Sequence, residues 1–247
     1  MNSLAQQRTF LTAEWKNLLM LNYAVDPDLL WPFVPPGTEL DSHEGLAYAS
    51  LIGFEFNRTH MFGHPVPFHQ SFEEVNLRFY VRRESRRGVV FIRELVPKVA
   101  VTAIARFAYG ENYSCVPMSH RLEANAGSVS VEYSWGFDAA RCTISATTSR
   151  TPYLPDRGSL SEFITEHYWG YAIRNGRTVE YQVDHPQWQV READIAQFSG
   201  AAARYYGLDF ARLLERPPDS AFLAEGSAVT VFKGTRISEA QRDAGPF

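Results

Sequence analysis

The chain has 247 residues, of which 45% are hydrophobic, 14% aromatic and 21% charged, a composition typical of a globular protein rather than a largely disordered one. Its net charge of −4 argues against a nucleic-acid binder, since such proteins carry a basic excess. The start of the chain has no signal-peptide pattern, and no apolar run reaches the roughly 20 residues that span a bilayer. Two isolated cysteines, Cys115 and Cys142, indicate a reducing compartment. We therefore expect a cytoplasmic protein that does not bind membranes.

The first half of the chain alternates apolar and polar residues with the period of two that is typical of β-strands. Its predicted elements are, in chain order, a strand over 14–25, a short helix within 26–37, a strand over 45–56, a loop over 60–70, and strands over 72–81 and 88–96. The short helix is indicated by Asp26, which can cap it, and by Pro27, which suits the first helical position.

The second half mixes strand and helix patterns. Its predicted elements are, in chain order, a helix over 97–110, strands near 113–123, 127–136 and 139–149, a helix over 159–176, a strand over 178–185, a helix over 191–207, and one or two strands over 221–237. A capping box of Ser159 and Glu162 and an apolar stripe that includes His167 favour the helix over 159–176. Because strands and helices do not alternate as βαβ units, we expect one mainly β (α+β) domain over residues 1–247, with a barrel-like core near 8–237 and a loose C-terminal tail.

Motifs for phosphate loops, dinucleotide binding and nucleophile elbows are absent from the sequence, so no cofactor is predicted. His60, His64 and His69 crowd the predicted loop over 60–70, but two prolines interrupt them and no acidic residue falls at a metal-ligand spacing. We expect a surface loop there, and no metal site.

The predicted strand over 72–81 has two faces of different chemistry. Its odd positions from 75 onward are apolar, whereas Glu74, Asn76, Arg78 and Tyr80 share the opposite face. Three interpretations of that polar face are open: it faces water, it lines an interior pocket, or it forms a structural network without a ligand. The strand predicted over 45–56 is apolar on both faces, which favours buried surroundings for the Glu and the Arg.

Two further segments carry side chains suited to a pocket. DHPQWQV (184–190) supplies His185, which titrates near neutral pH, and Trp188, which offers a flat apolar surface. ARFAYGENY (105–113) supplies Arg106 and Tyr113 where a predicted helix gives way to a strand. A structural turn for the first segment and a surface ion pair for Arg106 are the alternatives.

The order of these motifs resembles that of the YqjF-like family, a family of bacterial proteins of uncharacterised function. The resemblance covers roughly residues 8–236 and is carried by FLTAEWKNLLMLNYAVDPDLLWPFVPPGTEL, FEEVNLRFYV, FITEHYWGYAIRNGR and DHPQW. That family is distantly similar to acetoacetate decarboxylase. The resemblance therefore implies a closed, mainly β barrel with a few peripheral helices and a central pocket.

The resemblance also implies positions for the active-site groups of the decarboxylase. The segment 72–75 resembles the strand with its active-site glutamate, which falls on Glu74. The segment 105–110 resembles the start of its lysine segment, and the Schiff-base lysine then falls on Tyr113. Because tyrosine cannot form a Schiff base, and none of the three lysines of the chain matches the motif, decarboxylation by the lysine mechanism is not expected.

Two functions remain open at this point. The first is the binding of a small carbonyl or carboxylate compound without turnover. The second is a lysine-independent lyase or hydrolase in which Glu74 is the general acid or base and Tyr113 donates a hydrogen bond. For either function the predicted ligand contacts are Asn76, Arg78, Arg106, His185 and Trp188. The sequence leaves the ligand and the oligomeric state open, a homodimer included.

Overall fold

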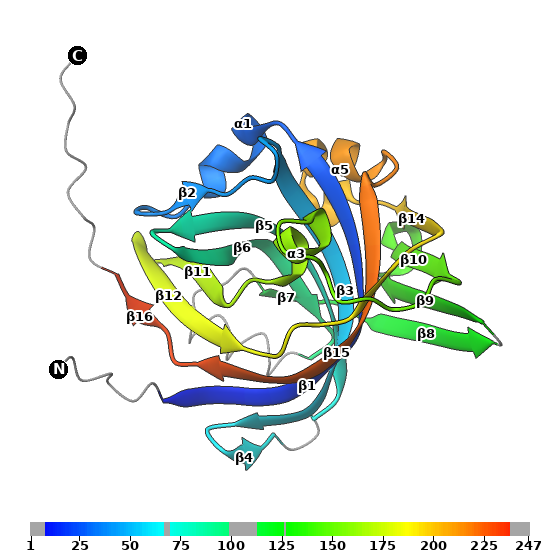
Figure 1. The fold of residues 1–247 in the computed structure, drawn as a ribbon, viewed down its shortest axis with the longest axis horizontal. Helices are drawn as coiled ribbons and strands as arrows, with labels where there is room; N and C mark the ends of the chain where they lie inside the picture. Colours follow the sequence, from blue (N-terminus) through cyan, green and yellow to red (C-terminus); the bar gives the residue numbers. More distant parts are fainter. Residues whose placement is uncertain (1–7, 67–69, 99–112, 126, 238–247) are drawn as a thin grey trace.

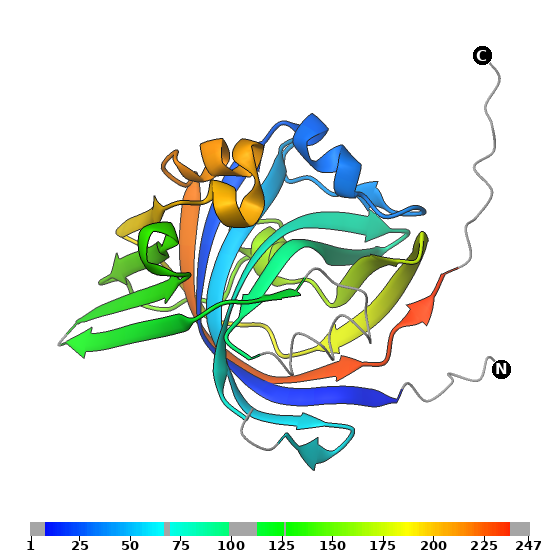
Figure 2. The ribbon, with the colours of Figure 1, turned by 180° about the vertical axis from the view of Figure 1, so that it is seen from behind.

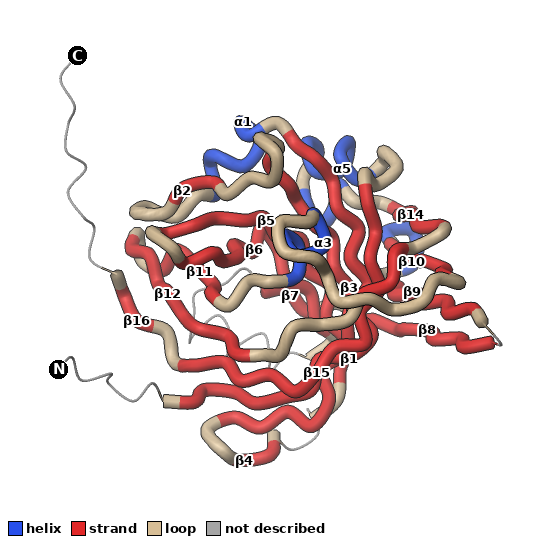
Figure 3. The backbone as a smooth tube through the Cα atoms, in the orientation of Figure 1, coloured by secondary structure: helices blue, strands red, loops and turns tan. Residues whose placement is uncertain are grey.

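The computed structural model describes residues 8–66, 70–98, 113–125 and 127–237, and these residues are mainly β, as predicted (Figures 1 and 3). They form a 12-stranded sheet and a 4-stranded sheet. The strands of the large sheet are β1 (Thr9–Val25), β2 (Glu39–Leu40), β3 (Ala47–Met61), β4 (His64–Pro65), β5 (Phe72–Arg83), β6 (Arg86–Val96), β7 (Tyr113–Cys115), β11 (Trp169–Arg174), β12 (Arg177–Asp184), β13 (Val190–Glu192), β15 (Ser220–Phe232) and β16 (Thr235–Arg236). The strands of the small sheet are β8 (Met118–Asn125), β9 (Ser128–Trp135), β10 (Cys142–Thr148) and β14 (Ile195–Gly200).

The helices are short and lie around the sheets. They are α1 (Pro27–Leu30), η1 (Trp31–Phe33), η2 (Asp138–Ala140), α3 (Leu160–Thr165), α4 (Ala203–Tyr206) and α5 (Leu208–Leu214). Asp26 caps α1 as expected, since its carboxylate accepts a hydrogen bond from the Asp28 amide at 3.0 Å. No helix of the described residues is long and apolar enough to cross a membrane.

Pairing in the large sheet runs in the order β15–β1–β3–β5–β6–β11–β12 and then returns to β15. The returning contact pairs Val183 of β12 with Val231 of β15. The β6–β11 contact is parallel, and it depends on Gly88, where a Cβ atom would lie 2.7 Å from the Trp169 carbonyl oxygen. The strands therefore form a ring, with an inner face that carries Glu74 and an outer face that carries Val75.

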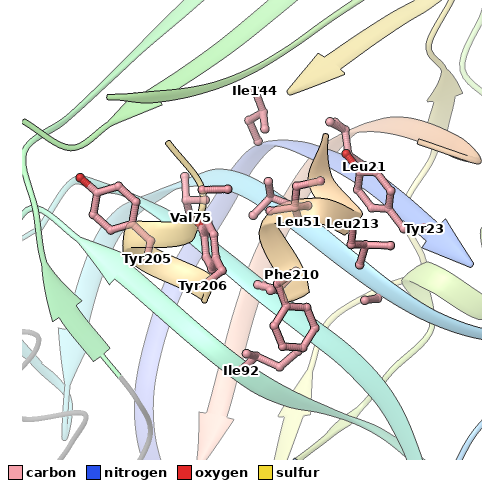
Figure 4. Packing of buried hydrophobic residues seen from close by; sticks show 14 of the residues in the cluster. Leu21, Tyr23, Leu51, Val75, Ile92, Ile144, Tyr205, Tyr206, Phe210 and Leu213 are labelled. Atoms are coloured by element: carbon pink, nitrogen blue, oxygen red, sulfur yellow. The ribbon is translucent and has the colours of Figure 1, made fainter. Parts of the chain in front are cut away.

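The outer face of the ring packs against the small sheet and against α4 and α5 (Figures 2 and 4). Leu51 and Val75 from the large sheet meet Tyr206 and Phe210 from the helices, and Ile144 comes from the small sheet. Each such buried apolar side chain stabilises the fold by about 1.5–3 kcal/mol. This core accounts for the apolar odd positions of the strand predicted over 72–81.

The predicted helix over 159–176 is wrong beyond its first turns. Half of its capping box forms: Ser159 Oγ accepts a hydrogen bond from the Glu162 amide at 3.2 Å, whereas the Glu162 carboxylate accepts from the Gly158 amide rather than from that of Ser159. The helix ends at Thr165. From Trp169 the chain is the strand β11, which turns into β12 at Asn175 and Gly176, both with positive φ. An Asn-Gly pair between alternating residues is a hairpin signal, and here the pairing of β11 with β12 outweighs the helical spacing.

The predicted helix over 191–207 is also wrong. Its first two residues belong to β13, residues 195–200 form β14, and only its end becomes α4. β14 completes the small sheet by pairing with β10 from Cys142↔Gly200 to Thr147↔Ile195, a long-range contact that local spacing does not reveal. The helix α5 was not predicted.

The other predicted strands are confirmed except the one near 113–123, which is two strands in different sheets, β7 and β8. The loop predicted over 60–70 contains the short strand β4. Most of the helix predicted over 97–110, and the C-terminal tail after residue 237, lie outside the described residues.

Candidate functional site

A cavity of about 120 Å³ adjoins the inner face of the ring. Most of its lining is apolar and includes Trp15, Phe54, Phe56, Phe91, Tyr181 and Val183. The polar side chains that line it are Glu74, Asn76, Arg78, Glu94, Tyr113, Thr165, His167 and His185. A few polar groups in a mostly apolar cavity are typical of small-molecule sites.

Strand register places three of the polar side chains in one row. Asn76 of β5 pairs with Glu94 of β6, and Glu94 pairs with Tyr113 of β7. Glu74, two residues along β5, is only 2% exposed. Its Oε1 accepts a hydrogen bond from Asn76 Nδ2 at 2.9 Å, and its Oε2 accepts one from the Tyr113 hydroxyl at 3.2 Å. The carboxylate therefore has two donors that hold it in position.

Arg78 brings a cation to the same face of β5. Its Nη2 donates to the Ile164 carbonyl oxygen, at the end of α3, at 3.1 Å, and its guanidinium carbon lies 5.6 Å from the Tyr80 ring centroid. Arg78 Nε and Asn76 Oδ1 are buried and have no hydrogen-bond partner in the described part of the chain. Buried polar atoms normally have partners, so these two atoms need an explanation.

His167 lies in the segment between α3 and β11 and is 6% exposed. Its ring centroid is 4.6 Å from that of Tyr80 and 5.8 Å from that of Phe163. Burial, reinforced by the charges of Arg78 and Arg87, lowers the pKa of His167 well below its usual 6.5, so the ring is neutral at pH 7. Among the residues that the structure describes, neither ring nitrogen has a hydrogen-bond partner.

His185 and Trp188 form an aromatic stack beside these groups. The His185 ring lies 4.8 Å from Tyr168 and 4.2 Å from Trp188, and the planes are nearly parallel. Trp188 Nε1 donates to Ser227 Oγ at 2.8 Å. His185 Nδ1 lies 2.9 Å from the Pro186 carbonyl oxygen, and burial lowers the pKa of this histidine. A carbonyl oxygen can only accept, so Nδ1 is the donor in this contact.

Six of the predicted site residues thus line one cavity, although they come from separate parts of the chain: Glu74, Asn76, Arg78, Tyr113, His185 and Trp188. Arg106 lies outside the described residues. In residues 8–66, 70–98, 113–125 and 127–237, three or more His, Cys, Asp or Glu side chains are nowhere grouped so that they could hold a metal ion.

Sequence reasoning missed Glu94 and His167. Strict alternation from Phe91 would put Glu94 on the outer face, but the β5–β6 register shifts between Leu77 and Arg78, and Ile92 is the extra residue. This bulge turns both Phe91 and Glu94 toward the cavity. His167 was assigned to a helical stripe, and its place after a helix ending at residue 165 carried no signal of its own.

Solved structures with the same fold are acetoacetate decarboxylase-like enzymes. The enduracididine biosynthesis enzyme MppR, solved with HEPES buffer bound, matches with a TM-score of 0.67 and 16% identity, over 97% of this chain and 92% of that chain. An acetoacetate decarboxylase-like enzyme from Sphingomonas wittichii RW1 matches with a TM-score of 0.65 and 14% identity, over 94% of each chain. Acetoacetate decarboxylase from Legionella pneumophila matches with a TM-score of 0.62 and 12% identity, over 97% of this chain and 92% of that chain. These likenesses confirm the predicted fold family.

Sequence comparison agrees with the motif order. The uncharacterized protein YqjF of Bacillus subtilis (strain 168) is 27% identical over 190 residues, which is 73% of this chain and 74% of that protein. The model of the DUF2071 family, described as an uncharacterized conserved protein, matches residues 12–228. A match over nearly the whole chain shows that the protein belongs to the DUF2071 family.

Proposed function

We propose that the ring of strands is a closed barrel and that its cavity binds a small carboxylate or carbonyl compound. The observation that carries this proposal is a set of buried polar atoms, on side chains that line the cavity, without hydrogen-bond partners in the described residues: Asn76 Oδ1, Arg78 Nε and both ring nitrogens of His167. Each such atom costs about 1–3 kcal/mol when it is left unsatisfied. A bound polar compound removes that cost, which a purely structural network does not.

The chemistry of these atoms favours an anionic compound with a carbonyl group. The Arg78 guanidinium has a planar set of donors that matches a carboxylate. A neutral His167 can donate to a carbonyl oxygen from one nitrogen without adding charge. A protein of the same fold, MppR, has been solved in complex with pyruvate, which makes pyruvate a natural first probe.

A second candidate is a lysine-independent lyase or hydrolase that uses the same cavity. The observation in its favour is the contact of the Glu74 carboxylate with the Tyr113 hydroxyl, since an acid beside a phenol can accept or deliver a proton at a bound carbonyl compound. The Schiff-base route is not part of this candidate because Tyr113 occupies the lysine position.

Binding can be tested by the thermal shift of the native protein, Arg78→Gln and Arg82→Gln with pyruvate, acetoacetate and other short carboxylates. Arg82 is the matched control because it lies on the same strand and forms an exposed ion pair with Glu39. At a ligand concentration of 100 times Kd, native and Arg82→Gln gain about 2.7 kcal/mol, and Arg78→Gln gains much less. Equal shifts in all three proteins, or no shift with any compound, would refute the proposal.

Turnover separates the two candidates. Proton NMR of each compound that binds is followed over hours with native protein and with Glu74→Gln. Conversion by the native protein that Glu74→Gln lacks supports the enzyme, and an unchanged spectrum with saturable binding supports the binding protein. If no compound binds and Glu74→Gln merely lowers the melting temperature, the polar cluster is structural.

A further inference from the structure

The polar groups of the cavity are concentrated on one part of its wall. Seven of the eight come from β5, β6, β7 and the end of α3 with the segment after it, and the eighth, His185, follows β12: the seven are Glu74, Asn76, Arg78, Glu94, Tyr113, Thr165 and His167. The lining from β1, β3, β12 and β15 is apolar or aromatic, with Trp15, Phe54, Phe56, Tyr181, Val183 and Val231.

Strand order puts β15 opposite the polar strands and β3 beside them, because Phe54 of β3 pairs with Glu74 of β5. In the ring, β15 leads to β5 through β1 and β3, and it leads to β6 through β12 and β11. The pair β5–β6 therefore lies as far from β15 as the ring allows. On the apolar side, the Trp15 ring makes edge contacts with Phe54 at 5.3 Å and Phe56 at 5.9 Å, which joins β1 and β3 into one aromatic surface.

We propose that the ligand is a 2-oxo acid with an aromatic or branched apolar body, rather than pyruvate itself. This inference rests on the proposed function. The carboxylate and carbonyl group bind Arg78, Asn76 and His167, and the body of the compound packs on the aromatic surface of β1 and β3. Pyruvate carries only a methyl group beyond its 2-oxo acid head group, so it leaves most of this apolar lining uncovered.

The decisive comparison is between pyruvate and phenylpyruvate, which share a head group and differ by a ring. By isothermal titration calorimetry, phenylpyruvate is expected to bind native protein at least about tenfold more tightly, because the ring leaves water for an apolar surface. The affinities of 2-oxobutyrate and 4-methyl-2-oxopentanoate are expected to lie between those of pyruvate and phenylpyruvate and to rise with the size of the apolar group.

Val231→Asn tests the apolar side without touching the head group. Val231 lines the cavity and is half-buried, and its neighbour Thr230 alternates to the other face of β15, so Thr230→Asn is the matched control. Val231→Asn is expected to remove most of the tenfold preference by weakening phenylpyruvate binding much more than pyruvate binding. Thr230→Asn is expected to keep the preference.

The outcomes separate this inference from the function on which it rests. Equal affinities across the 2-oxo acid series overturn the inference and leave binding of small carboxylates in place. Failure of every compound to bind overturns both. The ligand series on native protein gives this result even if a variant does not fold.

Discussion

The stability of the protein should fall below pH 6.5 because of His167. In the unfolded chain a histidine takes up a proton near its usual pKa of 6.5, whereas burial lowers the pKa of His167 in the fold well below that value. Protons therefore bind to the unfolded state preferentially. The contribution of His167 to the free energy of unfolding is fully present above pH 6.5 and is lost as the pH falls toward the pKa of the folded state. If the folded ring stays neutral, the loss is on the order of 1–2 kcal/mol between pH 5.5 and pH 5.0.

Urea unfolding of native protein and His167→Gln between about pH 8 and pH 5 measures this loss. The free energy of unfolding of the variant should decline less, by on the order of 1 kcal/mol at pH 5.5. His185, whose pKa is lowered in the same direction, is present in both proteins and cancels in the difference. His64→Gln, a change at an exposed residue of β4, is the control and should follow the native curve. If the free energy of unfolding falls with pH equally in native protein and in His167→Gln, the prediction that His167 is buried in a neutral form is refuted.

Three other predictions concern the core and the cysteines. Leu77→Ala removes a fully buried side chain from the outer face of β5 and should cost about 2–5 kcal/mol, seen as a lower urea midpoint with an unchanged m value. Gly53→Ala places a Cβ atom 2.6 Å from the Tyr133 ring, which packs the small sheet on the large one, and should cost about 1–3 kcal/mol by the same measurement. Iodoacetamide at pH 8 should label exposed Cys115 and spare Cys142, because burial raises the pKa of the Cys142 thiol to about 11. Mass spectrometry reads out both sites, and labelling of Cys142 without denaturant would contradict the last prediction.

The strand over 72–81 could be predicted in detail because both of its faces are governed by local alternation. Val75 and Leu77 pack in the outer core, and Glu74 and Asn76 line the cavity, as a period of two requires. The sequence alone could not decide whether the polar face met water, since that depends on strands from distant parts of the chain closing around it.

The errors arose where long-range pairing outweighs local spacing. The segment from Trp169 to Arg174 has aromatic residues at helical intervals, yet β12 and β6 pair with it from either side. Glu94 was missed because one extra residue, Ile92, reverses the faces of β6 after it. Neither a distant partner strand nor a bulge leaves a pattern in the segment itself.

His167 also tests whether the polar cavity is kept for a ligand or for the fold. Its ring lies against Tyr80 and Phe163 and has no hydrogen bond to lose in the described residues, so His167→Phe replaces a buried polar ring by an apolar one of similar shape. Unsatisfied buried polar atoms cost about 1–3 kcal/mol each, so the ligand-free variant should unfold at higher urea than native protein. Its thermal shift with 2-oxo acids should shrink. A variant that loses stability while its ligand response stays native would assign His167 to the fold instead.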